Sequence, residues 1–316
     1  MASISVLIPA YNCASTIRPT LDSVLQQTMV PKEILVMNDG SSDDTAAVLE
    51  SYGDRIKLFS QRNGGLAKAR NELLIRATGD FVAFLDSDDL WHSRYLEVQW
   101  KLFSEHPEAV AFWTNHINFS DGESPWSSDP LNVDGKTQLM SALDFFKRYN
   151  KATGPFSCFS YCCVPRQILT ELGNEPFKEM GAEDSYCCSL LALLGRPVVY
   201  SSQNLVAYRV RKDSLSHDHS WTFGVWVHVF ELLEERYKNA ANDELLRAFQ
   251  LAFASKRRGY AKLLMGSGRP LDAKKQLQKS VGDCRNLVSV AKSLALLSST
   301  YMPSMLQPKW PSKYRG

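Results

Sequence analysis

Short apolar segments alternate with helix-like segments over the first 90 residues, and this alternation restricts the possible folds most. The strand-like segments lie at residues 3–8, 33–37, 56–60 and 81–85. Apolar residues with helical spacing occupy residues 15–27, 43–52 and 65–77 between them. Strands that alternate with helices predict an α/β fold with a doubly wound, mostly parallel sheet. Ligands bind such sheets at the carboxyl ends of the strands.

The remainder of the chain changes character after residue 115. Helical spacing at 93–104 and strand character at 109–114 are followed by residues 120–135, which are rich in Ser, Asp, Gly and Pro and predict a long loop. Loops of this length often act as active-site lids. A helix is predicted at 182–194 and a strand at 198–210. From Trp221 onward the pattern predicts a C-terminal helical subdomain.

Composition indicates a globular protein of two or three domains. The chain has 316 residues, 44% of them hydrophobic, and no run of about 20 apolar residues that could span a bilayer. The seven cysteines are odd in number, and Met1 leads almost directly into a strand pattern without a secretory signal. We therefore expect a cytoplasmic protein with buried, reduced cysteines. The adjacent pairs Cys162–Cys163 and Cys187–Cys188 lack the spacing of zinc ligands.

The charges are distributed unevenly. Residues 247–316 hold 14 Lys or Arg and 2 Asp or Glu, a net charge of +12, so the first 246 residues carry −10. Trp310 and Tyr314 stand among the cations of the tail, as in proteins that bind an anionic membrane surface at its periphery. The alternative is a helical appendage with solvated basic faces. Nucleic acid is disfavoured as a partner because the acidic half would repel its phosphates.

Aspartates follow the strand-like segment at 81–85. Asp86 and Asp88 are two residues apart, so on an extended segment they share a side and can act on one polyanionic ligand. A nucleotide diphosphate approaches carboxylates only with a hard cation between them, which predicts Mg²⁺ or Mn²⁺. Such an ion also offsets the charge of a leaving diphosphate. The alternative is a turn in which Asp89 caps a helix that starts at Leu90.

Four segments in order resemble a known family. SVLIPAYN (5–12), NDGSSDDT (38–45), NGGLAKARN (63–71) and GDFVAFLDSDD (79–89) are similar to the donor domain of glycosyltransferase family 2, which has the GT-A fold. The resemblance is strong over residues 3–115 and weaker over about 150–216. It implies an inverting transfer from a nucleotide diphosphate sugar, most often a UDP sugar, with a divalent metal.

The resemblance also implies positions for the donor site. Asp39 would accept a hydrogen bond from a base N–H, Arg70 would lie near the phosphates, and Asp88 would hold the metal beside Asp86. The two glycines Gly64–Gly65 allow close backbone approach before a helix whose N-terminus favours anions. The implied nucleotide-binding residues are Pro9, Ala10, Tyr11, Asn12, Asp39, Lys68, Arg70, Asp86 and Ser87.

An inverting transfer needs a carboxylate that removes the proton of the acceptor hydroxyl. Glu183 and Asp184 resemble the Glu-Asp pair that opens a helix in the family. We predict Asp184 as the base and Glu183 as the residue that positions the acceptor. The alternative is that both carboxylates only favour a helix N-terminus electrostatically.

The segment at 208–220 departs from the family pattern. A His often follows Tyr-Arg by one residue there, but this chain has Arg211. Two hypotheses remain open. Arg211 binds the donor diphosphate as a planar bidentate donor, or His217 or His219 completes the metal site.

These inferences predict three regions. Residues 1–115 would bind the nucleotide-sugar donor, residues 116–220 would bind the acceptor and hold the base, and residues 221–316 would form the basic helical subdomain. The acceptor would be a hydroxyl of a glycan or of a lipid-linked sugar, in the synthesis of a surface polysaccharide. One rival function is a nucleotidyltransferase, although the Gly-rich, basic phosphate loop that it needs is missing near the first strand. The other is a nucleotide-sugar-binding protein without activity, which the set Asp86, Asp88 and Asp184 disfavours.

Overall fold

A computed structural model of the chain describes residues 3–126, 135–150, 156, 158–173, 175–178, 182–210, 219–239, 242–283 and 287–300. The chain forms two compact units. The first holds residues 1–179 and 186–211, and the second holds residues 180–185 and 212–316.

The first unit is built on one sheet of nine described strands. Their order is β3-β2-β1-β4-β8-β6-β9-β5, and β7 pairs with β9. The bounds are β1 Ile4–Ala10, β2 Glu33–Asn38, β3 Lys57–Ser60, β4 Phe81–Phe84, β5 Leu90–Trp91, β6 Phe112–Phe119, β7 Thr137–Met140, β8 Cys162–Pro165 and β9 Val198–Arg209.

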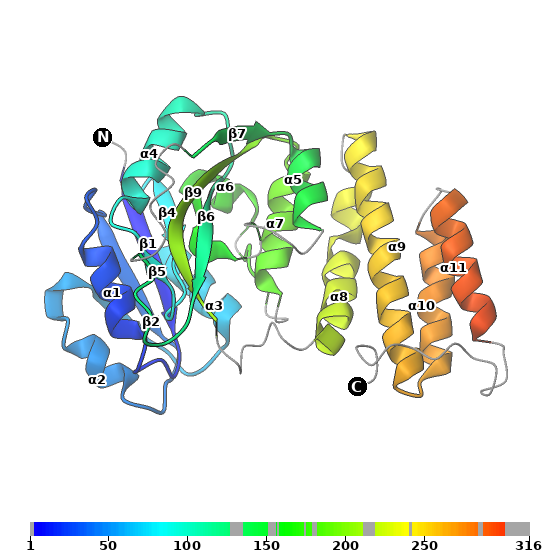
Figure 1. Ribbon diagram of the computed structural model, residues 1–316, viewed down its shortest axis with the longest axis horizontal. Helices are drawn as coiled ribbons and strands as arrows, with labels where there is room; N and C mark the ends of the chain where they lie inside the picture. The colour runs from blue at the N-terminus through cyan, green and yellow to red at the C-terminus, as the bar shows by residue number, and fades with distance from the viewer. Residues whose placement is uncertain are drawn as a thin grey trace. The chain divides into compact units, whose positions relative to one another are not determined.

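The first half of the sheet is parallel and is wound as predicted. β1 pairs in parallel with both β2 and β4, and β2 pairs in parallel with β3. Every residue of β1, β2 and β4 is buried, as in parallel strands that are covered on both faces. The helices of this half alternate with the strands along the chain and flank the sheet (Figure 1). They are α1 Ile17–Leu25, α2 Thr45–Glu50, α3 Leu66–Arg76 and α4 Tyr95–Glu105.

The second half of the sheet is mixed. β8 runs antiparallel to both β4 and β6, while β9 runs parallel to β6. The short strands β5 and β7 run antiparallel to β9. The predicted mostly parallel α/β sheet is thus confirmed, with antiparallel strands added. The helices here are α5 Ala142–Tyr149, α6 Arg166–Glu171 and α7 Glu183–Leu193.

Aromatic side chains fill the core behind β4. Phe84 meets Phe159 and Phe177 edge-on, with ring centroids 5.3 Å and 5.2 Å away. Asn71 of α3 fixes the backbone of Phe177, because its Nδ2 donates to the carbonyl of Phe177 at 2.8 Å and its Oδ1 accepts the N–H of Phe177 at 3.2 Å. The end of β4 is therefore supported by a rigid aromatic layer.

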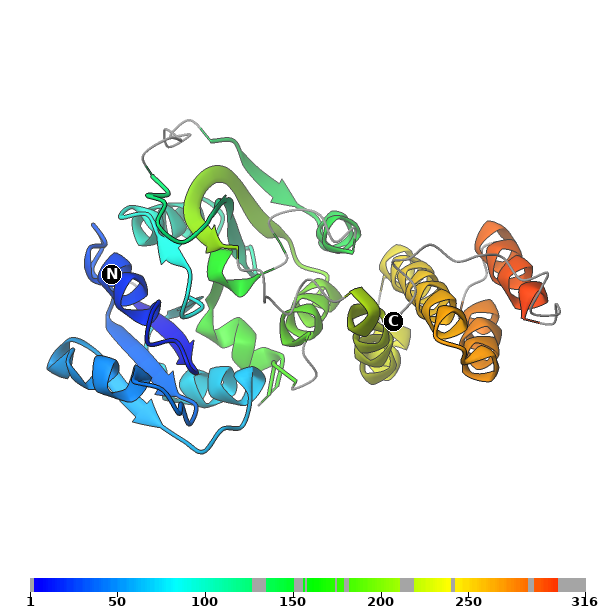
Figure 2. The same ribbon diagram turned by 60° about the horizontal axis from the view of Figure 1, so that its bottom comes forward.

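The second unit contains the predicted helical subdomain. Its helices are α8 His219–Lys238, α9 Asp243–Gly266, α10 Pro270–Gly282 and α11 Leu287–Ser299. They lie side by side in chain order in both views (Figures 1 and 2). In the part of the chain that is described, no helix has the length and hydropathy to cross a membrane.

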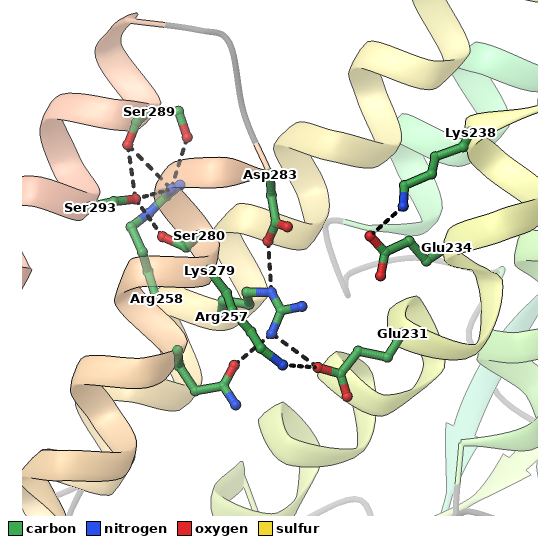
Figure 3. A network of polar contacts seen from close by, with 11 residues as sticks. Glu231, Glu234, Lys238, Arg257, Arg258, Lys279, Ser280, Asp283, Ser289 and Ser293 are labelled. Carbon is green, nitrogen blue, oxygen red and sulfur yellow. Dashed lines mark hydrogen bonds and ion pairs between the residues drawn. The ribbon is translucent and has the colours of Figure 1, made fainter.

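An arginine ties three of these helices together. The guanidinium of Arg257 is buried and donates to Asp283 Oδ2 at 2.7 Å, to Glu231 Oε1 at 3.1 Å and to Gln276 Oε1 at 2.8 Å (Figure 3). Its charge also lies 4.0 Å from the ring centroid of Phe253. Arg257 therefore has carboxylate partners on both α8 and the end of α10.

Candidate functional site

The loops that follow β1 and β2 are joined at the carboxyl edge of the sheet. Ala10 lies beside Asn38 in the register, and the N–H of Asp39 donates to the carbonyl of Ala10 at 2.8 Å. Asn12 has a positive φ of 46°, and its Oδ1 accepts the N–H of Ser42 at 2.8 Å. Pro9 and Ala10 are buried, whereas the side chain of Tyr11 is half exposed at this edge. Hydrogen bonds therefore join the predicted base-and-ribose segment to the loop that follows β2.

Asp39 controls the start of α3. Its Oδ1 accepts from Gln61 Nε2 at 2.6 Å and from the N–H of Gly64 at 2.9 Å, and its Oδ2 accepts the N–H of Gly65 at 2.8 Å. Gly65 has a φ of 88°, which other residues rarely adopt. Oδ2 accepts this one printed bond, and a carboxylate oxygen can accept two.

Lys68 and Arg70 point to different environments although both lie near the start of α3. Lys68 is exposed, and a Cβ at Gly64 would come within 2.5 Å of its Cδ, so the glycine makes room for the lysine. Arg70 is 1% exposed, and its Nη2 donates to Asp86 Oδ1 at 2.8 Å. Arg70 therefore fixes an aspartate of the site.

The turn from Asp86 to Asp89 is held from several parts of the fold. The N–H of Asp86 donates to Ser160 Oγ at 3.0 Å, and the thiol of Cys158 donates to Asp86 Oδ2 at 3.4 Å. On the other side, Arg209 Nε donates to the carbonyl of Asp88 at 2.8 Å. The side chains of Ser87 and Asp88 stay half-buried at the carboxyl end of β4.

Asp89 is a buried acid. Its Oδ1 accepts the N–H of Arg209 at 3.0 Å. Burial raises the pKa of Asp89 well above its usual range, and the nearby charges of Asp86 and Asp88 raise the pKa further. Burial therefore favours the protonated form of Asp89. The alternative that it caps a helix is wrong, because Leu90–Trp91 forms strand β5.

Three side chains could hold a metal ion. One ligand atom from each of Asp86, Asp89 and Cys158 lies within 4.8 Å of the others. The two carboxyl groups fit a hard ion such as Mg²⁺ or Mn²⁺, whereas a thiol suits softer metals. Asp88 is not a member of this group, although its charge acts on Asp89.

The predicted base residues open α7. Glu183 is buried and Asp184 is half-buried in the first turn of the helix. This turn belongs to the second unit, whereas Asp39 and Asp86 belong to the first. Glu183 and Asp184 are neighbours in this first turn, and their roles in the reaction stay a prediction. Arg211 and His217 lie outside the described residues, as does the side chain of His219.

Sequence reasoning missed Gln61, Cys158, Ser160 and Arg209. Gln61 adjoins a segment that the motifs flagged, and Arg209 lies within the segment 208–220, where it was given no role. Cys158 and Ser160 precede β8, for which the sequence shows no clear pattern, and only the pairing of β8 with β4 brings them to Asp86.

Known proteins resemble this chain in sequence. The model of the family described as "Glycosyl transferase family 2" matches residues 5–173. Glycosyltransferase GlyA of Streptococcus pneumoniae is 30% identical over 245 residues, which cover 76% of this chain and 35% of GlyA. The UDP-Glc:alpha-D-GlcNAc-diphosphoundecaprenol beta-1,3-glucosyltransferase WfgD of Escherichia coli is 47% identical over 98 residues, 30% of this chain and 39% of WfgD. The chain thus spans little more than a third of either relative.

Solved structures resemble its fold. S. aureus TarS 1-349, in complex with UDP-GlcNAc, aligns with a TM-score of 0.67 at 19% identity, over 95% of this chain and 89% of that one. The mannosyltransferase PcManGT from Pyrobaculum calidifontis, in complex with GDP-Man and Mn2+, aligns with a TM-score of 0.56 at 19% identity, over 98% and 88%. At this identity the likeness establishes the GT-A type of fold. Since the family model matches more than half of the chain, this protein belongs to glycosyltransferase family 2.

Proposed function

We propose that the chain is an inverting, metal-dependent glycosyltransferase that moves a sugar from a nucleotide diphosphate, with UDP as the proposed nucleotide, to a hydroxyl group. One observation carries the proposal: Asp39 follows β2 and Asp86 follows β4, and these parallel strands end at the same edge of the sheet. UDP is favoured because TarS is described with UDP-GlcNAc and WfgD is named for UDP-Glc.

The donor would lie across the loops that follow β1, β2 and β4. The segment Pro9–Asn12 would face the base and ribose, and Oδ2 of Asp39 would accept a base N–H. Lys68 is exposed at the first turn of α3, where a phosphate also meets the positive end of the helix dipole. Asp86 and Ser87 would contact the ribose of the donor.

We assign the metal to Asp88 with Asp86. Asp88 follows Asp86 by two residues and is half-buried at the carboxyl end of β4, which supports a role for both carboxylates in holding one cation. A bound Mn²⁺ or Mg²⁺ would offset charge on the leaving diphosphate. The complex of PcManGT with Mn2+ supports a divalent ion in this fold.

Asp184 would take the proton of the acceptor hydroxyl during in-line attack, and Glu183 would position the acceptor. An ionised carboxylate suits this role because its oxygens act only as hydrogen-bond acceptors and can take up the proton of the hydroxyl. Arg211 would bind the diphosphate, and His217 would complete the metal site if Arg211 does not. The predicted regions 1–115, 116–220 and 221–316 keep their donor, acceptor and basic helical roles in this proposal.

The acceptor would be a glycan or a lipid-linked sugar of surface polysaccharide synthesis. WfgD is named for a diphosphoundecaprenol-linked sugar, which supports a lipid-linked acceptor. The net charge of +12 over residues 247–316 would hold the protein at the inner face of an anionic membrane.

A screen of nucleotide sugars tests the proposal. Each donor is added with Mn²⁺, Mg²⁺ or a chelator, and thermal stabilisation and sugar release are both measured. We expect metal-dependent stabilisation and slow hydrolysis with at least one UDP sugar, and neither in Asp88→Asn. Stabilisation by a donor without turnover on any acceptor would favour the binding protein. Diphosphate release from a nucleoside triphosphate and a sugar phosphate would favour the nucleotidyltransferase.

A further inference from the structure

The last described helix of the second unit exposes apolar side chains. α11 stands at the end of the row of helices and packs on α9 and α10 (Figures 1 and 2). Three of its large apolar residues are nonetheless largely open to solvent: Leu287 is 85% exposed, Val288 is 63% exposed and Leu294 is 49% exposed. A helix on the surface of a globular protein usually buries such residues and exposes polar ones.

These residues form one continuous stripe along α11. Leu287, Ala291 and Leu294 follow one another at helical spacing, so they lie in one line on the same face. Val288 and Ala295 are also exposed and border this line. Single exposed leucines are common on protein surfaces, whereas a contiguous apolar patch marks an interaction surface. We call these five residues the α11 stripe.

The opposite face of α11 is partly polar. Ser289 and Ser293 are buried, and both hydroxyl oxygens accept hydrogen bonds from Arg258 Nη1, at 2.8 Å and 3.1 Å (Figure 3). Apolar packing is added near the end of the helix, where Leu296 and Leu297 contact the core of α9 and α10. The first half of α11 is therefore attached through serine hydroxyls, and its leucine and valine side chains stay at the surface.

The charge of this part of the chain indicates the partner. After Asp283 the sequence holds five Lys or Arg and no Asp or Glu. Lys292 is one of the five, and it is exposed on α11 between Val288 and Ala295. At an anionic lipid surface, apolar side chains enter the boundary of the acyl chains while cations stay at the headgroups. An apolar stripe with cations and no acids fits such a surface.

A second copy of the chain fits the stripe less well. In a symmetric dimer the same face would meet itself, so the two copies of Lys292 would approach each other. α11 has no carboxylate that could compensate this repulsion. An anionic lipid surface instead neutralises the lysine, so the charge favours lipid over a second copy.

We propose that the α11 stripe docks on an anionic membrane surface, with Leu287, Val288 and Leu294 entering the lipid and Lys292 at the phosphate headgroups. α11 then lies in the plane of the interface, as amphipathic helices do. The inference supplies the contact surface for the membrane that the proposed function invokes. It rests on that part of the proposed function and is independent of the transferase chemistry.

Co-sedimentation of the full chain with lipid vesicles tests the proposal, in the presence of a chelator and without a nucleotide sugar. One set of vesicles contains equal parts of phosphatidylcholine and phosphatidylglycerol, and the other contains phosphatidylcholine alone. We expect binding to the first set and far weaker binding to the second. Leu287→Gln and Leu294→Gln should each weaken the binding on the order of tenfold, because each removes one leucine from the lipid contact.

Leu271→Gln is the matched control. Leu271 is 75% exposed on α10 and does not belong to the α11 stripe, so this variant should bind as the wild type does. All of these leucines are largely exposed, so thermal melting should be unchanged, which separates a loss of binding from a loss of folding. Since none of the substitutions changes the net charge, added salt should weaken binding by the same factor in every variant.

Four results would overturn the proposal. Three come from the vesicles: no binding to the anionic set, an equal loss in Leu271→Gln, and undiminished binding in Leu287→Gln/Leu294→Gln. The fourth comes from light scattering of the free chain at several concentrations, where a dimer that the double variant dissociates would assign the stripe to a second copy. The vesicles carry no sugar acceptor and the assay contains no donor. The result is therefore independent of whether the nucleotide-sugar screen detects a transferase.

Discussion

Arg209 makes hydrogen bonds to two adjacent residues of the turn at 86–89. Its N–H donates to Asp89 Oδ1 at 3.0 Å, and its Nε donates to the carbonyl of Asp88 at 2.8 Å. An ion pair with Asp121 and the ring of Phe119, 4.5 Å from the guanidinium carbon, hold the arginine itself. The last residue of β9 therefore sets the position of the proposed metal ligand.

We predict that Arg209→Lys weakens metal-dependent donor binding. The backbone bond to Asp89 survives, but the Nε bond that fixes Asp88 is lost. Loss of a group that orients a metal ligand typically costs 10–100-fold in metal affinity or activity. Calorimetric titration of Mn²⁺ with the donor present measures the effect. Arg94→Lys is the control because Arg94 pairs with an exposed glutamate. Equal affinities in both variants would mean that Arg209 does not position Asp88.

Asp88→Asn and Cys158→Ser separate the two possible ligand sets. If Asp88 holds the ion with Asp86, Asp88→Asn should abolish metal-dependent turnover, and Cys158→Ser should retain most of it with the same preference for Mn²⁺ or Mg²⁺. Titrating activity with each metal checks the prediction. A large loss of Mn²⁺ affinity in Cys158→Ser alone would shift the site to Asp86, Asp89 and Cys158.

Asp184→Asn should lower kcat by about 10²–10⁴-fold, the usual contribution of a general base. Donor affinity should change little, because the proposed role concerns only the acceptor. Turnover is measured with a donor that the nucleotide-sugar screen identifies. Donor affinity is measured separately, by titrating each variant with the same donor. Glu183→Gln is the companion variant and should raise the KM of the acceptor more than it lowers kcat. Near-normal turnover in Asp184→Asn would reject the assignment.

Glu33 should make the fold acid-sensitive. Its carboxylate is buried, yet hydrogen bonds from Lys57, Ser5 and Thr78 outweigh burial and lower its pKa from 4.5 to about 2. A lowered pKa stabilises the fold above about pH 4.5, and this stability, about 3 kcal/mol, is lost as the pH falls toward 2.

Urea unfolding across this pH range checks the prediction. Glu33→Gln should be less stable at pH 7, and its stability should change less between pH 4.5 and pH 2 than that of the wild type. The exposed Glu50→Gln should behave as the wild type does. If Glu33→Gln loses stability in acid as steeply as the wild type, another group causes the acid sensitivity.

Local patterns were enough to predict the parallel half of the sheet. The segments around β1, β2 and β4 are continuous apolar runs that end at Asn12, Asp39 and Asp86, and the structure places all three at one edge. The helical subdomain that contains α8 to α11 was also predicted from the spacing of its apolar residues.

Pairings between distant segments could not be predicted in this way. β8 and α6 lie in a stretch with no clear period, and β7 has only four residues. The contact of Cys158 with Asp86 joins residues 72 positions apart, and that of Arg209 with Asp88 joins residues 121 apart. The raised pKa of Asp89 depends on its burial by such distant segments, which no motif encodes.

A single helix links the two ends of the proposed donor site. Asp39 binds the glycines at which α3 begins, and Arg70, in the next turn of the same helix, pairs with Asp86. Because a short helix moves as a rigid rod, any shift of Asp39 on meeting a nucleobase would be transmitted mechanically to Asp86. Binding of the base at Asp39 and the placement of the Asp86 carboxylate would then be coupled.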